Sequence, residues 1–122
     1  MEKVDGLIRT ALDEGLILAD TEKGILYRSN GRRIVPEMNR KGYLRFRIRV
    51  DGRKCHFCVH RVIYIASGRS IPEGCHIDHI NGNKQDNRLC NLQPLTDSEN
   101  KRKQSAMRKE NRMRPQPLLF FC

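Results

Sequence analysis

The stretch from His76 to Asn100, HIDHINGNKQDNRLCNLQPLTDSEN, decides how its part of the chain folds. A short strand is predicted from His76 to His79, followed by Asn, Gly and Asp residues that favour turns. Residues 89–95 supply a second apolar run that can return as the partner strand. Thr96 and Glu99 form the Thr-x-x-Glu pattern of a capping box, which predicts the start of a helix. The predicted order is strand, polar loop, strand, helix.

The same stretch carries groups suited to phosphodiester hydrolysis, which needs a base to activate water and a cation to bind the phosphate oxygens. His79 can serve as the base, because an imidazole titrates near neutral pH. Asp78 and Asn100 offer the hard oxygen ligands that Mg²⁺ prefers, and the two can face each other in such a unit. Adjacent strand residues point to opposite faces, so a twist or bulge is expected to bring Asp78 and His79 to one phosphate. His76 could contact metal or DNA, or be structural.

Composition indicates a small basic protein with a polyanionic partner. The chain has 122 residues, enough for one modest core, and a formal net charge of +10. Residues 28–54 carry ten basic side chains against two acidic ones, and residues 101–114 carry seven against one. Two basic segments therefore bracket the central stretch, a pattern expected when phosphates are held on both sides of a metal site.

The N-terminal half predicts a helix followed by a small antiparallel sheet. Apolar residues from Val4 to Leu12 follow helical spacing, and the helix should end near Gly15. Residues 16–19 and 24–28 predict short strands, and residues 32–35 are a further candidate strand.

Residues 43–50 alternate strictly between polar and apolar side chains, and Asp51-Gly52 supplies a two-residue turn. Pairing outward from that turn sets Ile48 opposite Cys55, Phe46 opposite Phe57 and Leu44 opposite Val59. The other face collects like charges, which favours contact with a nucleic-acid backbone over a merely solvated surface. The predicted DNA contacts of this hairpin are Tyr43, Arg45, Arg47, Arg49 and Lys54.

Cysteine usage predicts reduced thiols. Five cysteines and no signal-like hydrophobic run at the N-terminus predict a soluble cytoplasmic protein without a membrane span. In the register above, Cys55 and Cys58 point to opposite faces of the strand, which disfavours a zinc site built from these residues with Cys75 and Cys90. Residues 60–66 predict a short helix that ends at Gly68, with His60 and Arg61 at its start in either a structural or a DNA-contacting role.

Asp78-His79, Asn91 and Asn100, with the polar loop 80–88, resemble the signature of the HNH (ββα-metal) endonucleases, especially the phage and intron-encoded homing endonucleases. The resemblance extends over about residues 20 to 104. It implies that His79 is the general base, that Asp78 and Asn100 bind the metal, and that Asn91 braces the loop and helps to position the base. Asn100 stands where many HNH enzymes have a histidine, which favours Mg²⁺ or Mn²⁺ over softer metals.

The expected protein is therefore an α+β, single-domain nuclease, a monomer that cuts or nicks double-stranded DNA. Its expected parts are an N-terminal helix and lead-in (1–19), a DNA-facing antiparallel sheet and helix (20–68), the ββα-metal motif (69–104) and a flexible basic tail (105–122). Lys101, Arg102 and Lys103 are further predicted DNA contacts. The alternatives are a non-catalytic DNA-binding protein that retains the HNH fold and an RNA-directed enzyme. If a phage encodes the chain, its expected location is the host cytoplasm.

Overall fold

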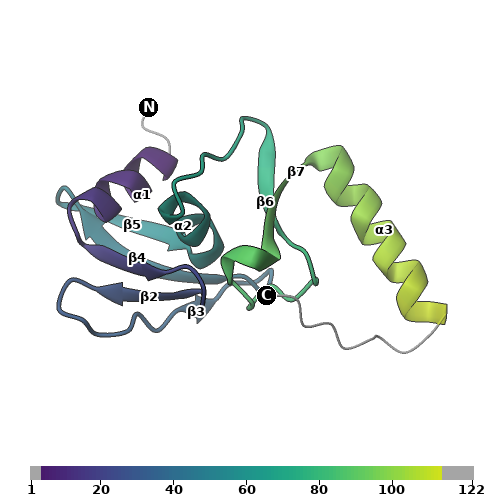
Figure 1. Ribbon diagram of the computed structural model, residues 1–122, viewed down its shortest axis with the longest axis horizontal. Helices are drawn as coiled ribbons and strands as arrows, with labels where there is room; N and C mark the ends of the chain where they lie inside the picture. The colour runs from purple at the N-terminus through teal and green to yellow at the C-terminus, as the bar shows by residue number, and fades with distance from the viewer. Residues whose placement is uncertain (1–3, 114–122) are drawn as a thin grey trace.

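The computed structural model describes the backbone of residues 4–113 and the side chains of residues 4–106 (Figure 1). Along the chain the elements are α1 (Val4–Asp13), β1 (Ile17–Asp20), β2 (Ile25–Arg28), β3 (Glu37–Met38), β4 (Leu44–Val50), β5 (Arg53–Cys58), α2 (Val59–Ala66), β6 (Cys75–His79), η1 (Leu89–Asn91), β7 (Leu92–Thr96) and α3 (Asp97–Met113). No described helix is long and apolar enough to cross a membrane.

The strands form three small antiparallel sheets, β1-β2, β3-β4-β5 and β6-β7, so the predicted α+β class is confirmed. Both strands expected between residues 16 and 28 are present. The further strand expected at residues 32–35 is reduced to one isolated bridge, between Tyr27 and Arg33. The segment that precedes Pro36 therefore follows β2 without extending its sheet.

The β4–β5 hairpin has the register that the sequence predicts, with Phe46 opposite Phe57 and Ile48 opposite Cys55. Asp51 and Gly52 both adopt positive φ, 52° and 77°, as a turn matched to the strand twist requires. The expected pairing of Leu44 with Val59 is wrong. The reason is that β5 ends at Cys58 and the chain turns into α2 at Val59.

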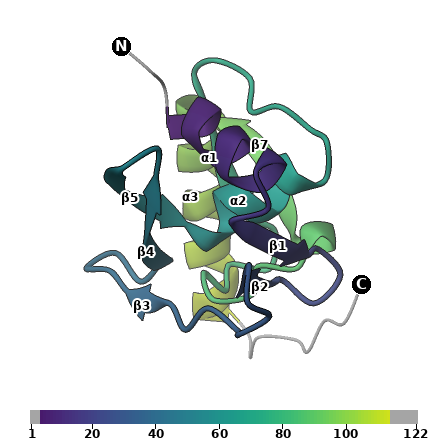
Figure 2. The ribbon, with the colours of Figure 1, turned by 90° about the vertical axis from the view of Figure 1, so that its left-hand side faces the viewer.

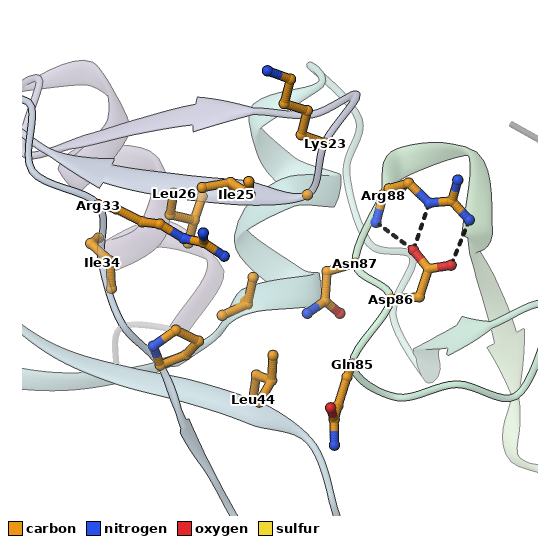
Figure 3. A pocket seen from close by; sticks show the side chains of 13 residues that line it. Lys23, Ile25, Leu26, Arg33, Ile34, Leu44, Gln85, Asp86, Asn87 and Arg88 are labelled. Atoms are coloured by element: carbon orange, nitrogen blue, oxygen red, sulfur yellow. Dashed lines mark hydrogen bonds and ion pairs between the residues drawn. The ribbon is translucent and has the colours of Figure 1, made fainter.

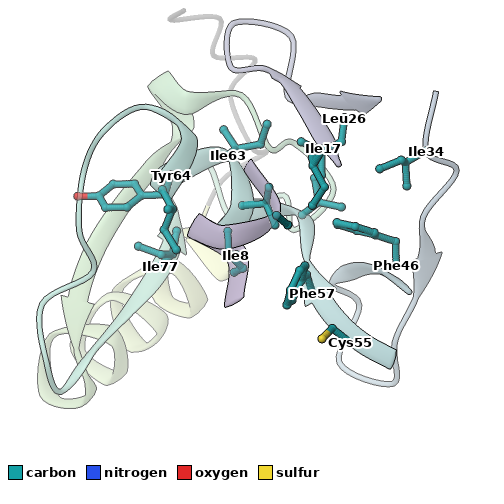
Figure 4. Close-up of a cluster of buried hydrophobic side chains, with 14 of the residues drawn as sticks. Ile8, Ile17, Leu26, Ile34, Phe46, Cys55, Phe57, Ile63, Tyr64 and Ile77 are labelled. Carbon is teal, nitrogen blue, oxygen red and sulfur yellow. The ribbon is translucent and has the colours of Figure 1, made fainter. Parts of the chain in front are cut away.

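The core lies where α1 and α2 cover the sheets (Figure 4). Ile8 of α1, Phe57 of β5 and Ile63 of α2 are all almost fully buried, with at most 1% of each residue exposed. Helix α2 occupies the middle of the molecule and contacts α1, both hairpins of the N-terminal half and β6. One helix therefore joins the N-terminal sheets to the β6–β7 hairpin, and its hydrophobic burial fixes their relative positions.

The β6–β7 hairpin and α3 form a separate ββα unit at one end of the molecule, with α3 on the far side of the strands from the β4–β5 hairpin (Figures 1 and 2). The predicted capping box is confirmed: the Thr96 amide donates to Glu99 Oε1 at 3.0 Å, and the Glu99 amide donates to Thr96 Oγ1 at 3.2 Å. Helix α3 runs to Met113.

The expectation of a flexible tail from residue 105 is therefore wrong up to residue 113. Residues 105–113 contain good helix formers and no Gly or Pro, and the first helix breaker is Pro115. The rest of the predicted tail, 114–122, lies outside the described residues.

The β1–β2 turn is fitted closely against the polar loop of the ββα unit. Gly24 has a φ of +69°, and a Cβ built on it would lie 2.5 Å from the carbonyl carbon of Asn87 and 2.6 Å from the amide nitrogen of Arg88. The amide of Leu89 also donates to the carbonyl of Thr21 at 2.9 Å. The turn therefore supports the loop backbone from one side, and only glycine leaves room for it.

Replacing Gly24 with Ala should lower the free energy of unfolding by about 3 kcal/mol, because the new methyl group meets backbone atoms that cannot move independently. Gly31→Ala is the matched control. Gly31 also has positive φ, +85°, but open space around its Cβ position, so only the conformational cost of about 1 kcal/mol should appear. Urea denaturation of both variants measures the difference, and equal losses would contradict this account of the Gly24 contact.

Candidate active site

A groove with a volume of about 590 Å³ lies between β6, the start of α2 and the first turns of α3. Asp78 and Asn100 both line it, which confirms the expectation that these two side chains face a common space. His76 and Asp97 line it beside them, and His60 and Arg61 line it from the start of α2. The groove therefore collects oxygen, imidazole and guanidinium groups from three elements that are far apart in sequence.

Asp78 is held by two groups from the elements beside it. Gln93, its partner across the β6–β7 ladder, donates from Nε2 to Asp78 Oδ2 at 3.0 Å. Lys103 of α3 forms an ion pair with the same oxygen and also donates to the carbonyl of His79 at 2.6 Å. Lys103 was expected to contact DNA, but here its ammonium group lies on Asp78. The position in front of the Asp78 carboxylate therefore already accommodates a cationic group.

His79 is the last residue of β6 and is only 3% exposed. Its Nε2 lies 2.8 Å from Oδ1 of Asn87. Because that oxygen can only accept, Nε2 carries the hydrogen, and the lone pair of the neutral ring is on Nδ1. Burial lowers the pKa of the His79 imidazole, although the Asn87 hydrogen bond and the Asp78 carboxylate oppose the shift. The ring is therefore neutral at neutral pH, in the form that can accept a proton.

The bulge expected between Asp78 and His79 is absent. The β6–β7 ladder is unbroken from Cys75 opposite Thr96 to His79 opposite Leu92, so the two side chains leave opposite faces of the strand. Asp78 lines the groove directly, whereas His79 is not among the lining residues.

Two aromatic rings that do line the groove pack on His79. The centroid of the His79 ring lies 5.1 Å from that of His60 and 5.8 Å from that of Tyr43. Tyr43 in turn lies 5.1 Å from His60, so the three rings form one cluster. Tyr43, expected to contact DNA, therefore separates His79 from part of the groove and is half-buried.

Asn91, only 4% exposed, holds the loop between β6 and β7 together. Its Oδ1 accepts from the amide of Asn81 at 2.9 Å, and its Nδ2 donates to Asn81 Oδ1 at 3.0 Å and to the carbonyl of Asp86 at 2.9 Å. The loop is therefore held by hydrogen bonds among its own residues. Because the hydrogen bonds of the Asn91 side chain go to Asn81 and Asp86, its effect on His79 is transmitted through the loop.

The loop segment that carries Asn87 is stiffened by an ion pair. Arg88 donates from Nε to Asp86 Oδ1 at 2.8 Å and from Nη2 to Asp86 Oδ2 at 2.7 Å, beside a pocket of about 210 Å³ that β2 and β4 also border (Figure 3). The Arg88 hydrogen bonds lower the pKa of Asp86 and keep it ionised. The backbone on both sides of Asn87 is therefore fixed, and so is the amide that orients His79.

His76, for which the sequence left three roles open, forms a pair with Asp97 at the start of α3. His76 Nε2 lies 2.7 Å from Asp97 Oδ1, and the two side chains are 60% and 75% exposed. The pair lines the groove close to Asn100, so His76 is a second imidazole available to a molecule bound there.

The predicted basic stripe lies on the exposed face of the β4–β5 hairpin. Arg45 is opposite Cys58, Arg47 opposite His56 and Arg49 opposite Lys54. None of these arginines lines the groove, but Cys58, at the end of the stripe, does. Lys101 and Arg102 are exposed on α3, beyond the groove. The basic residues therefore flank the groove on two sides, and the stripe leads into it.

Sequence reasoning missed the role of Asn87, which was interpreted as a loop former. Its buried amide is the hydrogen-bond partner of His79, and nothing in the spacing of the asparagines distinguishes it from Asn83, which is exposed. It also left His60 undecided, although that ring packs on both Tyr43 and His79. Both assignments need the three-dimensional structure.

The donor set of the groove fits a hard divalent cation. Asp78 and Asn100 supply oxygen ligands, and Mg²⁺ needs only one or two protein ligands besides water and substrate. Within the described side chains, no three His, Cys, Asp or Glu residues converge as a full protein shell would require. Cys55 is buried on the apolar face of β5 while Cys58 lines the groove, so the predicted divergence of these two cysteines is confirmed.

Comparison with known proteins agrees with this geometry. Residues 57–102 match a family model described as HNH endonuclease. One similar solved structure is described as DNA binding and cleavage by the HNH homing endonuclease I-HmuI. It matches 81% of this chain with a TM-score of 0.68 and 26% sequence identity. The chain spans 60% of the length of that homing endonuclease. None of the curated proteins matches the chain significantly.

Asn91→Ala should lower the free energy of unfolding by about 3 kcal/mol, because it removes the three hydrogen bonds that the buried Asn91 side chain makes to Asn81 and Asp86. Asn83→Ala is the matched control in the same loop. Asn83 accepts a hydrogen bond from the Gln85 amide but is exposed, so water can replace it at a cost below about 1 kcal/mol. Urea denaturation distinguishes them, and an equally mild effect of both changes would refute the bracing role of Asn91.

His60 should make the protein sensitive to acid. Burial, assisted by the nearby His79 and Arg61, lowers the pKa of His60 to about 3, from 6.5 in the unfolded chain. The unfolded state therefore binds more protons between these values. The stabilising effect is complete above pH 6.5, and the free energy of unfolding falls with decreasing pH by up to about 1.4 kcal/mol per pH unit.

The check is urea denaturation of the wild type and of His60→Phe at several values between pH 7 and pH 4. Phe keeps a ring in the cluster but has no proton to bind, so the variant should lose less stability over this range. Both proteins contain the same carboxyl groups, so the contribution of these groups to the pH dependence of stability is the same in both curves. Parallel curves for the two proteins would contradict the assigned pKa.

Proposed function

We propose that this chain, whose residues 57–102 match a family model described as HNH endonuclease, is a divalent-metal-dependent endonuclease that hydrolyses phosphodiester bonds of double-stranded DNA. The observation that carries the proposal is the shared groove of Asp78 and Asn100, with His79 next to Asp78 on β6. A carboxylate, an amide oxygen and a neutral imidazole are the groups that metal-assisted hydrolysis of a phosphodiester requires.

HNH nucleases generally use divalent metal ions, and Asp78 and Asn100 are the residues that would hold one here. We propose Mg²⁺ or Mn²⁺, because both proposed ligands are oxygen atoms. The bound ion supplies charge that stabilises the phosphate oxygens and the leaving 3′ oxygen. Lys103 forms an ion pair with Asp78 in this structure. For the Asp78 carboxylate to hold a metal ion, the Lys103 ammonium group would have to move away from it.

His79 is the proposed general base. The Asn87 amide holds its Nε2, so Nδ1 accepts the proton from the attacking water. Asn91 acts on His79 indirectly, because its hydrogen bonds fix the loop on which Asn87 lies. His79 is buried under the rings of Tyr43 and His60, so the attacking water must reach Nδ1 past these two rings.

The basic surface is the proposed binding site for the DNA backbone. Arg45, Arg47, Arg49 and Lys54 would grip phosphates on the β4–β5 side, and Lys101 and Arg102 on the α3 side, with Tyr43 at the edge of the groove. Lys103 joins them once released from Asp78. Binding should therefore be strongly salt-dependent. We propose that the protein acts as a monomer in the cytoplasm, and that the products carry a 3′ hydroxyl and a 5′ phosphate.

The direct test is incubation of supercoiled plasmid with the protein in Mg²⁺, in Mn²⁺ and in EDTA. Nicked or linear plasmid should form with either metal and not in EDTA. Intact plasmid in both metals, at a protein concentration that visibly retards it in a gel, would favour a non-catalytic DNA-binding protein with the same fold. Competition between duplex DNA and duplex RNA tests whether RNA is the preferred substrate.

His79→Ala should reduce cleavage by a factor of about 10² to 10⁴, the usual contribution of a general base, and leave DNA affinity unchanged. His76→Ala is the matched control, because His76 is the other imidazole on β6 and lies in the groove. A large loss in His76→Ala with full activity in His79→Ala would transfer the role of base to the His76–Asp97 pair.

A further inference from the structure

The start of α2 forms part of the groove wall, through Cys58, His60 and Arg61. Cys58 is the N-cap residue, and its side chain makes no capping hydrogen bond. The first turn of the helix contains no acidic residue either. The first amide groups of any helix lack intrahelical acceptors, and the helix dipole adds positive potential at the same end. This end of α2 is therefore suited to an anion.

A second observation, independent of the helix end, indicates a missing ligand. Among all described side chains, two buried polar atoms have no hydrogen-bond partner, Nδ1 of His60 and Nε of Arg61. His60 is 7% exposed, so its ring is nine-tenths buried. Buried polar atoms are nearly always satisfied in folded proteins, and leaving one unpaired costs free energy. Both unpaired atoms belong to consecutive residues at the start of α2, so a single ligand there could satisfy them.

Both residues line the same groove as Asp78 and Asn100. Arg61 is oriented from behind by Asp5 of α1, whose Oδ1 contacts Arg61 Nη2, and this contact leaves Nε free. His60 is fixed by its packing against Tyr43 and His79. The arrangement therefore places preset donors on the wall of the groove formed by α2, whereas the proposed metal ligands come from β6 and α3.

We propose that the start of α2, with His60 and Arg61, is a binding subsite for a phosphate group of the DNA strand in the groove. The identity of the anion rests on the proposed function. The subsite binds the phosphate through Arg61, the ring N–H of His60 and the open amides of the first helical turn. Its role is to hold the strand so that the phosphate at Asp78 and Asn100 is aligned for attack.

The first test measures binding of a fluorescently labelled DNA duplex in EDTA, so that no cleavage occurs. Arg61→Gln should weaken binding about tenfold and reduce the slope of log affinity against log salt concentration by about one phosphate contact. Asp5→Asn is the matched control, since it breaks the same ion pair but leaves the Arg61 charge in the groove. Its affinity should equal or exceed that of the wild type. Equal weakening in both variants would overturn the proposal, because it would trace the loss to the ion pair.

The second test asks whether one phosphate is contacted. The test uses duplexes in which one phosphate is replaced by a neutral methylphosphonate. At one position this replacement should weaken binding by the wild type. The same replacement should weaken binding by Arg61→Gln or His60→Phe only slightly, because these variants already lack the contact. If the losses of affinity from the methylphosphonate and from the substitution were additive at every position, the proposed subsite would be wrong. Failure of the wild type to bind DNA at all would instead refute the proposed function, so the two outcomes are distinguishable.

Discussion

The arrangement of the site depends on the buried amide of Asn91. Its three hydrogen bonds to Asn81 and Asp86 close the loop between β6 and β7 and satisfy the polar atoms of the buried Asn91 side chain. The closed loop places Asn87 beside His79 and lets the β1–β2 turn pack on its backbone at Gly24. A polar network of this kind stabilises one geometry strongly, because every member left unpaired would be penalised.

Helix α2 couples this loop to the rest of the molecule. Its apolar side chains form the centre of the core, while its first residues, His60 and Arg61, extend into the groove. The helix therefore combines well-satisfied packing with two unpaired polar atoms. A fold selected for stability alone would replace such groups by apolar ones, so their presence where a substrate would lie is consistent with stability given up for binding.

The charged side chains of the β4–β5 hairpin and of the groove also carry a cost in stability. The outer face of the β4–β5 hairpin carries like charges that repel one another, and the groove beside it holds Asp78 against Lys103. The ion pair with Lys103 compensates the charge of the largely buried Asp78 carboxylate. Positive side chains therefore surround a groove whose own wall carries the Asp78 carboxylate.

The sequence by itself determined most of the elements, the β4–β5 register up to Cys58, the capping box and the groove pair Asp78 and Asn100, because alternation, turn residues and caps act over a few residues. Tertiary structure alone decided that Asn87 rather than Asn83 holds His79, that Lys103 lies on Asp78, and that His60 packs between Tyr43 and His79. These contacts join residues from different elements. They follow from how α2 and α3 pack on the hairpins, which no local pattern encodes.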